Sequence, residues 1–218
     1  MGKISFFTKE QQLILDLIKQ NAFLQSQFYF TGGTALSAYY LQHRYSDDLD
    51  FFSKSRFDNE VILTLVEEWS QKHGFTFRSR FVEVVYIFNL TFGKNTFLKV
   101  DFAYYPHRKI EKETIIDGIG VDSLTDIAVN KLFTISQRTN IKDFVDLYFL
   151  LQKFSVWDLL SGVRVKFGME LEPILVGSDF LKAETFEFLP KMIKPLTLAE
   201  LKTFFREKAK EIAGKSVK

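Results

Sequence analysis

Apolar residues recur every three or four positions in several parts of the chain, a spacing that predicts amphipathic helices. The predicted helices cover about residues 9–25, 58–73, 124–135, 141–154 and 198–212, and a further helix begins at Ser155. Thr8-x-x-Gln11 and Thr197-x-x-Glu200 have the residue types of capping boxes, which satisfy the first backbone N–H groups of a helix. Proline and glycine interrupt residues 168–196, so the pattern gives no clear prediction there.

Shorter apolar or alternating runs predict strands, because side chains on a strand alternate between two faces. The predicted strands cover residues 28–30, 48–52, 75–80, 82–92 and 97–105. Pro106, Gly118 and Gly120 indicate a loop over residues 106–122. The chain is therefore predicted to have an α/β (α+β) fold. A mixed sheet with flanking helices covers residues 1–120, and a helical half covers residues 121–218.

The composition excludes several classes of protein. With 218 residues, 46% of them hydrophobic and 25 of them Phe, the chain can bury a sizeable core and is not disordered. It has no cysteine, which excludes disulfides and thiolate chemistry. Its net charge of +2 is not that of a dedicated nucleic-acid binder, although a local basic face is compatible with it. No secretory signal or membrane-spanning run is visible, so we expect a cytoplasmic protein.

The most informative stretch is residues 28–52, FYFTGGTALSAYYLQHRYSDDLDFF. A buried strand ends at Gly32-Gly33, where the backbone can turn tightly and approach a ligand. Thr34 is predicted to cap a helix over residues 35–41. If residues 48–52 form a strand, its period of two places Asp48 and Asp50 on one face.

Such a layout suits nucleotide chemistry. Backbone N–H groups at a glycine-rich turn attract phosphate, and a pair of carboxylates suits Mg²⁺, which binds a few carboxylates together with phosphate oxygens. Phosphoryl or nucleotidyl transfer needs both parts at once. Two like charges on one strand face repel each other, and a bound cation removes that cost.

The motifs carry a resemblance to a known family. Gly32-Gly33-Thr34, followed by Arg44-x-Ser46-x-Asp48-Leu49-Asp50, resembles the signature of polymerase-beta-like nucleotidyltransferases. With Thr-Ala-Leu after the glycines and Arg-x-Ser before the carboxylates, it is similar to the AbiEii/AbiGii toxin family. The later motifs Asp126-x(4)-Lys131 and Lys142-Asp143-x-x-Asp146-Leu147 extend the resemblance over about residues 28–152.

The resemblance implies a nucleotidyltransferase-like fold and a set of site residues. The implied catalytic residues are Asp48, Asp50, Asp101, Lys131 and Asp146. The implied metal ligands, for Mg²⁺, are Asp48, Asp50 and Asp101. The implied nucleotide-binding residues are Gly32, Gly33, Thr34, Arg44, Ser46, Lys131 and Asp143. In this family-based interpretation residues 121–218 complete the active-site cleft.

Simpler explanations stay open for some of these residues. Asp101 could be a surface carboxylate paired with Lys99, although its place on a later strand favours a metal ligand or a base. Lys131 could be a surface lysine whose stem lies along its helix. Asp143 and Asp146 could interact with the dipole of the helix they begin.

The expected reaction is the transfer of a nucleoside monophosphate from an NTP to an acceptor hydroxyl, with release of pyrophosphate. The resemblance implies that the acceptor is RNA, in particular tRNA, and that the protein is a toxin with a separately encoded antitoxin. The alternative is a non-catalytic nucleotide-binding regulator on the same fold. An RNA acceptor requires a basic surface beside the site. The candidates for that surface are Arg78, Arg80, Lys94, Lys99, Arg108 and Lys109.

Overall fold

The computed structural model of the protein describes residues 6–216, with side chains up to Gly214. The chain divides into two compact units. The sheet unit contains the described residues up to Tyr40, together with Ser46–His107 and Lys112–Asp122. The helical unit contains Leu41–Tyr45, Arg108–Glu111 and the chain from Ser123 onward. Two short segments, 41–45 and 108–111, thus fold with helices that come later in the sequence.

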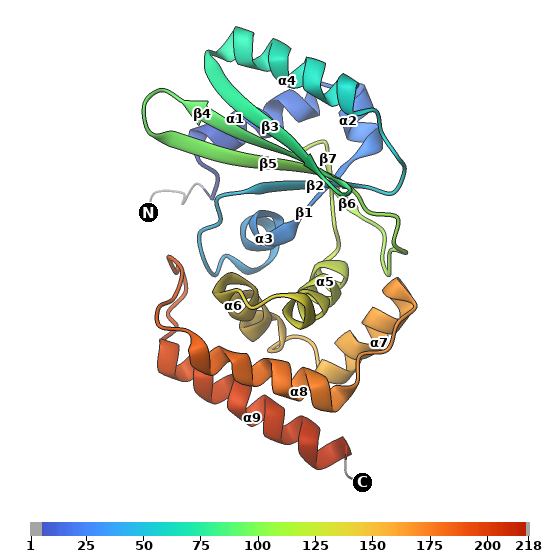
Figure 1. Ribbon diagram of the computed structural model, residues 1–218, viewed down its shortest axis with the longest axis vertical. Coiled ribbons are helices and arrows are strands. Elements are labelled where there is room, and N and C mark those ends of the chain that lie inside the picture. Colours follow the sequence, from blue (N-terminus) through green and yellow to red (C-terminus); the bar gives the residue numbers. More distant parts are fainter. Residues whose placement is uncertain (1–5, 217–218) are drawn as a thin grey trace. The chain divides into compact units, whose positions relative to one another are not determined.

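The sheet unit is built on a seven-stranded mixed sheet with the strand order β3-β4-β5-β2-β1-β7-β6 (Figure 1). The strands are β1 (Tyr29–Thr31), β2 (Leu49–Ser53), β3 (Phe75–Val82), β4 (Val85–Phe92), β5 (Thr96–Tyr104), β6 (Thr114–Ile116) and β7 (Ile119–Val121). β1 pairs antiparallel with β2 and parallel with β7, while β2 and β5 are parallel. The predicted fold class, a mixed sheet with flanking helices followed by a helical half, is confirmed.

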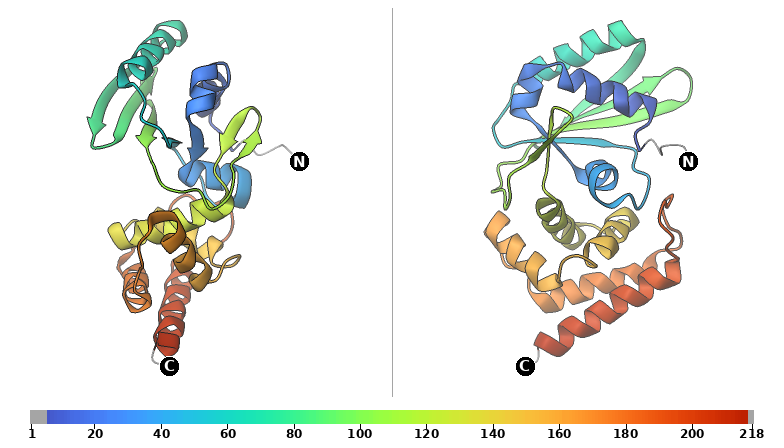
Figure 2. Two further views of the ribbon diagram at one scale, coloured as in Figure 1. Left: turned by 90° about the vertical axis from the view of Figure 1, so that its right-hand side faces the viewer. Right: turned by 180° about the vertical axis from the view of Figure 1, so that it is seen from behind.

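Helices cover the two faces of the sheet unevenly. They are α1 (Lys9–Lys19), α2 (Ala22–Gln27), α3 (Gly32–Ala35), which continues as a π-helix (Leu36–Leu41), and α4 (Asn59–His73). α1, α2 and α4 lie on one side of the sheet and α3 lies on the other (Figures 1 and 2). α4 begins at an Asp58 cap and ends at Gly74, whose positive φ of 70° closes the helix in the left-handed region.

A row of stacked aromatic side chains forms the core beneath α1, α2 and α4. Phe30 pairs with Phe51 and Phe51 pairs with Phe102 across three neighbouring strands. Both ring pairs are stacked, with centroids 5.2 and 5.5 Å apart, and all three residues are fully buried. Because alternate residues face the same side, the intervening residues Thr31, Asp50 and Asp101 point to the opposite face of the sheet.

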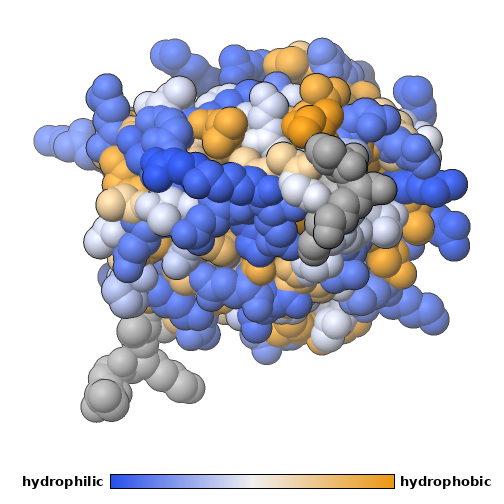
Figure 3. All heavy atoms as spheres, turned by 90° about the horizontal axis from the view of Figure 1, so that it is seen from below, coloured by the Kyte–Doolittle hydropathy of each residue, from blue (hydrophilic) through white to orange (hydrophobic). Residues whose placement is uncertain are grey.

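The helical unit contains α5 (Leu124–Gln137), α6 (Ile141–Leu150), α7 (Val156–Phe167), α8 (Pro173–Leu181), a 3₁₀ turn (Lys182–Thr185) and α9 (Leu198–Ser216). Phe144, Phe180 and Phe205 are fully buried, and Phe205 contacts each of the other two rings edge to face, which joins α6, α8 and α9. Figure 3 shows a mostly hydrophilic surface with separate hydrophobic spots. Within residues 6–216, no helix combines the length and the apolar character needed to cross a bilayer.

Several predicted boundaries were wrong at places where the backbone turns. The predicted helix 9–25 is two helices, because Asn21 accepts a hydrogen bond from the backbone N–H of Leu24 and caps α2. Thr34 does not cap a helix, since α3 already begins at Gly32 and Thr31 occupies the cap position. The turn predicted near residue 80 lies instead at Glu83, which has a φ of 55°. Glutamate is not a residue type that indicates a left-handed backbone, so the sequence does not mark the turn at this position.

The loop predicted over residues 106–122 contains a hairpin. β6 and β7 are joined through Asp117 and Gly118, which have φ values of 49° and 81°. Asp-Gly between apolar residues is a strong hairpin signal because a two-residue turn of this kind needs positive φ at both positions. The sequence thus contained the information, and the prediction of a loop was wrong. β7 pairs with β1 and completes the sheet beside Phe30.

The aromatic core generates a stability prediction. Phe102 is 0% exposed and Phe97, on the same strand, is 72% exposed. Phe102→Ala should lower the free energy of unfolding by about 3–5 kcal/mol, because it removes buried surface and leaves a cavity. Phe97→Ala should change it by less than about 0.5 kcal/mol. Urea unfolding followed by circular dichroism measures both; equal effects would mean that the stacked row is not the core of the unit.

Candidate active site on the sheet unit

A row of polar side chains crosses the face of the sheet opposite the aromatic core. Thr31 on β1 is paired with Asp50 on β2, and Asp50 is paired with Asp101 on β5. The same row continues to Ile87 on β4. Directly paired residues on one face have neighbouring side chains. The register therefore brings together two of the three predicted metal ligands, Asp50 and Asp101, from strands that are distant in the sequence.

Gly32 lies directly against the carboxylate of Asp50. A methyl group added at Gly32 would sit 2.8 Å from Cγ of Asp50 and closer still to its Oδ2. The backbone of Gly32 has a φ of 74°, which other residues adopt at a cost. This position needs glycine for two independent reasons, so the glycine turn and the acidic strand of the motif form one contact.

Asp48 precedes β2 rather than lying within it. The loop before it is held from two sides. The amide of Gln11 donates 2.9 Å hydrogen bonds to the backbone carbonyls of Ser46 and Asp47, and the hydroxyl of Thr34 donates to the carbonyl of Asp48. Thr34 and Ser46, both predicted nucleotide ligands, thus take part in positioning the acidic loop.

Asp101 is only 8% exposed and is unevenly satisfied. The ammonium of Lys99 donates to its Oδ2, while its Oδ1 is buried and has no hydrogen-bond partner among the described residues. Burial raises the pKa of Asp101; Lys99 opposes this rise and the charge of Asp48 adds to it. Asp101 thus pairs with Lys99, as the simpler explanation expects, but it is buried beside a second carboxylate rather than facing solvent, and its role as a metal ligand or base stays a prediction.

The donor chemistry of this face suits a hard cation. Asp48, Asp50 and Asp101 supply carboxylate oxygens, which Mg²⁺ prefers. The buried Oδ1 of Asp101 has no hydrogen-bond partner among the residues that the structure describes, and a bound cation would be a partner for it. In the described part of the chain, however, no three acidic or histidine side chains converge closely enough to hold a metal ion. The three residues are of the type that binds this ion, and metal binding stays a prediction.

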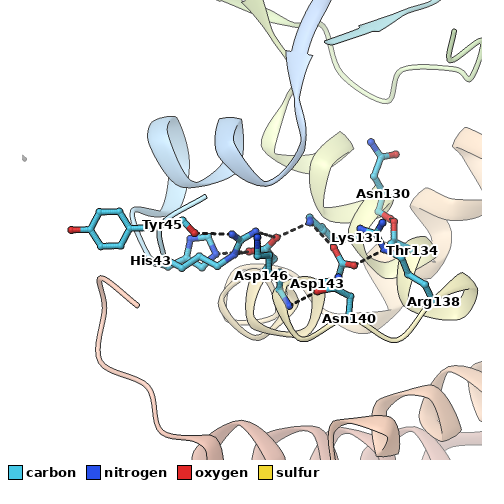
Figure 4. A network of polar contacts seen from close by, with 11 residues as sticks. His43, Tyr45, Asn130, Lys131, Thr134, Arg138, Asn140, Asp143 and Asp146 are labelled. Atoms are coloured by element: carbon cyan, nitrogen blue, oxygen red, sulfur yellow. Dashed lines mark hydrogen bonds and ion pairs between the residues drawn. The ribbon is translucent and has the colours of Figure 1, made fainter. Parts of the chain in front are cut away.

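The other predicted charged residues lie together in the helical unit. The guanidinium of Arg44 binds both oxygens of Asp146, with Nε at 2.6 Å and Nη2 at 2.9 Å. The ammonium of Lys131 lies 2.7 Å from Asp143 and 2.7 Å from Asp146. His43 Nε2 is also 2.7 Å from Asp146. Figure 4 shows His43, Lys131, Asp143 and Asp146 pointing toward one another from the 43–45 segment, α5 and α6.

The electrostatics of this buried network favour its ionised form. Burial raises the pKa of Asp146, but the charges of Lys131 and Arg44 outweigh burial and hold the pKa well below 3.8. Burial likewise lowers the pKa of Lys131, and the two carboxylates more than compensate and raise it. Lys131 is therefore neither a surface lysine nor an unpaired cation, and Asp146 does more than interact with a helix dipole.

Sequence reasoning missed three contributors to the helical unit. His43 and Arg138 complete the network, the latter by an Nε contact of 2.9 Å with Asp143. Lys166 forms a fully buried 2.7 Å ion pair with Asp126, whose carboxylate also accepts the backbone N–H groups of residues 110 and 111. The partners of His43 and Lys166 are distant in the sequence, so no local charge pattern marks those two pairs. Arg138 is only five residues from Asp143.

Comparison with known proteins shows the family to which the chain belongs. Residues 16–215 match the family model described as "Nucleotidyl transferase AbiEii toxin, Type IV TA system". The chain belongs to the AbiEii family of nucleotidyltransferase toxins. It is 31% identical over 209 residues to the uncharacterized protein aq_aa25 of Aquifex aeolicus, covering 93% of this chain and 96% of that protein.

Solved structures share the fold at lower identity. MenT4, the nucleotidyltransferase toxin Rv2826c of Mycobacterium tuberculosis, is 20% identical with a TM-score of 0.63, covering 94% of this chain and 82% of that one. JHP933 from Helicobacter pylori is also 20% identical, with a TM-score of 0.54 and 96% coverage of both chains. Membership of the AbiEii family makes this protein a nucleotidyltransferase, and the roles of its individual residues stay predictions.

The contact between Gly32 and Asp50 generates a prediction with a matched control. Gly74 has a similar φ of 70°, but a methyl group there would meet nothing within 4 Å. Gly74→Ala should therefore cost only the left-handed backbone penalty of about 1–2 kcal/mol. Gly32→Ala adds the clash with Asp50 and should both destabilise the protein further and reduce nucleotide transfer. Thermal unfolding and transfer assays measure both effects; equal losses for the two variants would argue against the close contact.

The buried network generates a second prediction. Asp146→Asn leaves Arg44 and Lys131 buried with an incomplete set of counter-charges and should destabilise the protein by about 3–5 kcal/mol at neutral pH. Asp16→Asn is the control, because the Asp16–Lys19 pair is 3.4 Å long and partly exposed and should contribute less than about 1 kcal/mol. Urea unfolding of the three proteins gives the comparison.

The pH dependence of the stability difference between wild type and Asp146→Asn follows from the directions of the pKa shifts. Asp146 has a lowered folded pKa, so its contribution is present above its ordinary value of 3.8 and is lost as the pH falls through the folded pKa. The gap between wild type and Asp146→Asn should therefore narrow in strong acid. Burial lowers the pKa of His43, so the wild type should begin to lose stability once the pH falls below 6.5. A gap that widens in acid would contradict the ion-pair assignment.

Proposed function

We propose that the protein is a Mg²⁺-dependent enzyme that transfers a nucleoside monophosphate from an NTP to a hydroxyl group of RNA. The observation that carries the proposal is the register of β1, β2 and β5. It places Asp50 beside Asp101 on one sheet face, with the glycine turn packed against Asp50. A phosphate-approaching turn next to paired carboxylates is the combination that nucleotidyl transfer requires.

In this proposal the backbone of Gly32, Gly33 and Thr34 faces the triphosphate. Asp48, Asp50 and Asp101 would hold Mg²⁺, which would neutralise charge on the phosphates. The close contact with Gly32 fixes the position of the Asp50 side chain relative to the turn. The hydrogen bonds to the 46–48 loop restrain Asp48 in the same way.

The proposed reaction is a single displacement at the α-phosphorus. The oxygen of the acceptor hydroxyl forms a bond to the α-phosphorus, and the bond from that phosphorus to the β-phosphate bridging oxygen breaks, which releases pyrophosphate. Asp101 accepts the hydroxyl proton, a role for which a buried carboxylate with a raised pKa is better suited than an exposed one. The atom that would take this proton is its Oδ1, which has no hydrogen-bond partner in the described chain, and Asp101 then acts as the base in place of holding Mg²⁺.

For the helical network we propose a positioning role. The family-based prediction gave Arg44, Lys131, Asp143 and Asp146 contacts with the nucleotide or the reaction. Lys131 would have to leave two carboxylates, each 2.7 Å away, to bind phosphate. The contacts support instead a network that fixes the 41–45 segment against α5 and α6, directly before the acidic loop of the sheet unit in the sequence.

The partners in the proposal follow from the family. The AbiEii description names a toxin of a toxin–antitoxin system, which supports a separately encoded antitoxin for this chain. RNA, in particular tRNA, is proposed as the acceptor. NTPs and RNA are both cytoplasmic, so the reaction is proposed to take place there.

The proposal is tested by substituting the acidic pair. Asp48→Asn with Asp50→Asn should reduce transfer of label from an α-labelled NTP to total RNA by at least about a hundredfold, because it removes the charge that the metal needs. Asp47→Asn is the matched control, since Asp47 is the exposed carboxylate next to the pair. It should keep near-normal transfer.

Thermal unfolding of the three proteins shows whether the fold is intact. Unchanged transfer in the double variant would contradict the assignment of Asp48 and Asp50. A wild type that binds NTPs but transfers none of them, with every NTP and with Mg²⁺ present, would favour the non-catalytic regulator.

A further inference from the structure

The polar face of the sheet continues beyond the carboxylates onto β3, β4 and β5, where it is open to solvent. Pairing places Asp101, Ile87 and Arg80 in one row and Lys99, Asn89 and Arg78 in the next. A third row contains Phe97, Thr91 and Thr76. We call these outer positions the open sheet face, made up of Thr76, Arg78, Arg80, Asn89, Thr91, Phe97 and Lys99. All of them are at least partly exposed.

The open sheet face is basic. β3, β4 and β5 carry three cationic residues, Arg78, Arg80 and Lys99, and their one acidic residue is Asp101. Arg78 and Arg80 are exposed and form no ion pair within the described part of the chain. The two guanidinium groups therefore present unneutralised positive charge beside the carboxylate row, where phosphate would be attracted.

Phe97 adds a second, independent feature. It is 72% exposed, in a unit whose other large aromatic residues on β4 and β5 are mostly buried. It lies four residues from Asp101 on the same strand face, about 14 Å away at the usual rise of about 3.4 Å per residue. An exposed ring on a basic sheet face is the arrangement on which unpaired bases stack, and such stacking does not depend on sequence.

We propose that the open sheet face binds a single-stranded segment of the RNA acceptor, with Arg78 and Arg80 on its phosphates and a base stacked on Phe97. This proposal rests on the proposed function, because the strand leads to the hydroxyl that reacts beside Asp101. The exposed ring favours a single strand over a duplex, whose bases are already stacked on one another. The charge favours a polyanion, and the ring favours RNA over an acidic protein surface.

The experiment measures binding of a fluorescein-labelled 12-nucleotide oligouridine by anisotropy at several salt concentrations. The test variants are Arg78→Gln with Arg80→Gln, and Phe97→Ala. Lys72→Gln with Lys210→Gln removes the same charge from α4 and α9. Phe188→Ala removes an equally exposed ring, because Phe188 is 73% exposed and Phe97 is 72% exposed.

The arginine variant should weaken binding at least about tenfold at low salt. It should also reduce the slope of log K against log salt by about 1.4, since each phosphate contact on a single strand contributes about 0.7. Phe97→Ala should weaken binding by about 5- to 150-fold, the range of one lost base stack, and leave the salt slope unchanged. Both control variants should bind like the wild type.

Four results would overturn the proposal. One is oligouridine binding that neither test variant changes. Another is equal losses in the test and control variants, which would indicate charge or ring effects without a defined surface. The third is binding of a blunt RNA duplex as tightly as the single strand. The fourth is the absence of any RNA binding. The last result would indicate that the open sheet face binds an acidic protein surface instead of RNA.

A transfer assay separates this proposal from the proposed function. If total RNA is labelled normally by the arginine variant at every RNA concentration, the open sheet face is not the acceptor surface and the transferase proposal stands. If the wild type binds oligouridine through Arg78, Arg80 and Phe97 but labels no RNA, the binding surface stands and the transferase proposal fails. The expected result is normal transfer at saturating RNA with a raised KM for RNA in both test variants.

Discussion

The contact between the Asp50 carboxylate and the backbone of Gly32 is the constraint on which the candidate site depends. It exists because Thr31 and Asp50 are paired across β1 and β2, so that the residue after Thr31 must pass over the acidic side chain. A side chain at position 32 would push the turn away from the strand. The same register places the aromatic row on the other face, so the packing of the core and the placement of the carboxylates are consequences of one pairing.

The buried aspartates of the two units differ in how far neighbouring positive charges compensate their negative charge. In the helical unit Asp146 is fully buried among Arg44, Lys131 and His43, and its pKa is lowered well below the ordinary value. In the sheet unit Asp101 is buried with one lysine and an additional carboxylate nearby, and its pKa is raised. Fully compensated charge stabilises a fold, whereas incompletely compensated charge of one sign is typical of sites that bind cations or move protons. This contrast supports the two proposals made above, that the carboxylates of the sheet unit take part in the reaction and that the helical network has a positioning role.

The sequence predicted the local geometry around the carboxylates of the sheet unit well, because the signals for it are local. The glycine pair, the alternation around Asp50 and the lone acid at Asp101 follow from turn geometry and strand periodicity. Charged residues whose partners are remote were harder to interpret. Arg44 lies four residues before Asp48 in the motif, yet it folds with Asp146 in the other unit. Thr34 was misread as a cap because the helix begins at a left-handed glycine, a start that propensity does not indicate.

The central claim is that the carboxylate row carries out nucleotidyl transfer to RNA. It is tested most directly by following the phosphate of the substrate. Wild-type protein is incubated with total RNA and Mg²⁺ in parallel with α-labelled and γ-labelled NTPs, and the label in RNA and in released pyrophosphate is measured. The account predicts that α-label enters RNA, that γ-label appears only in pyrophosphate, and that the two products form in equal amounts. Entry of γ-label into RNA, or NTP consumption without labelled RNA, would contradict it.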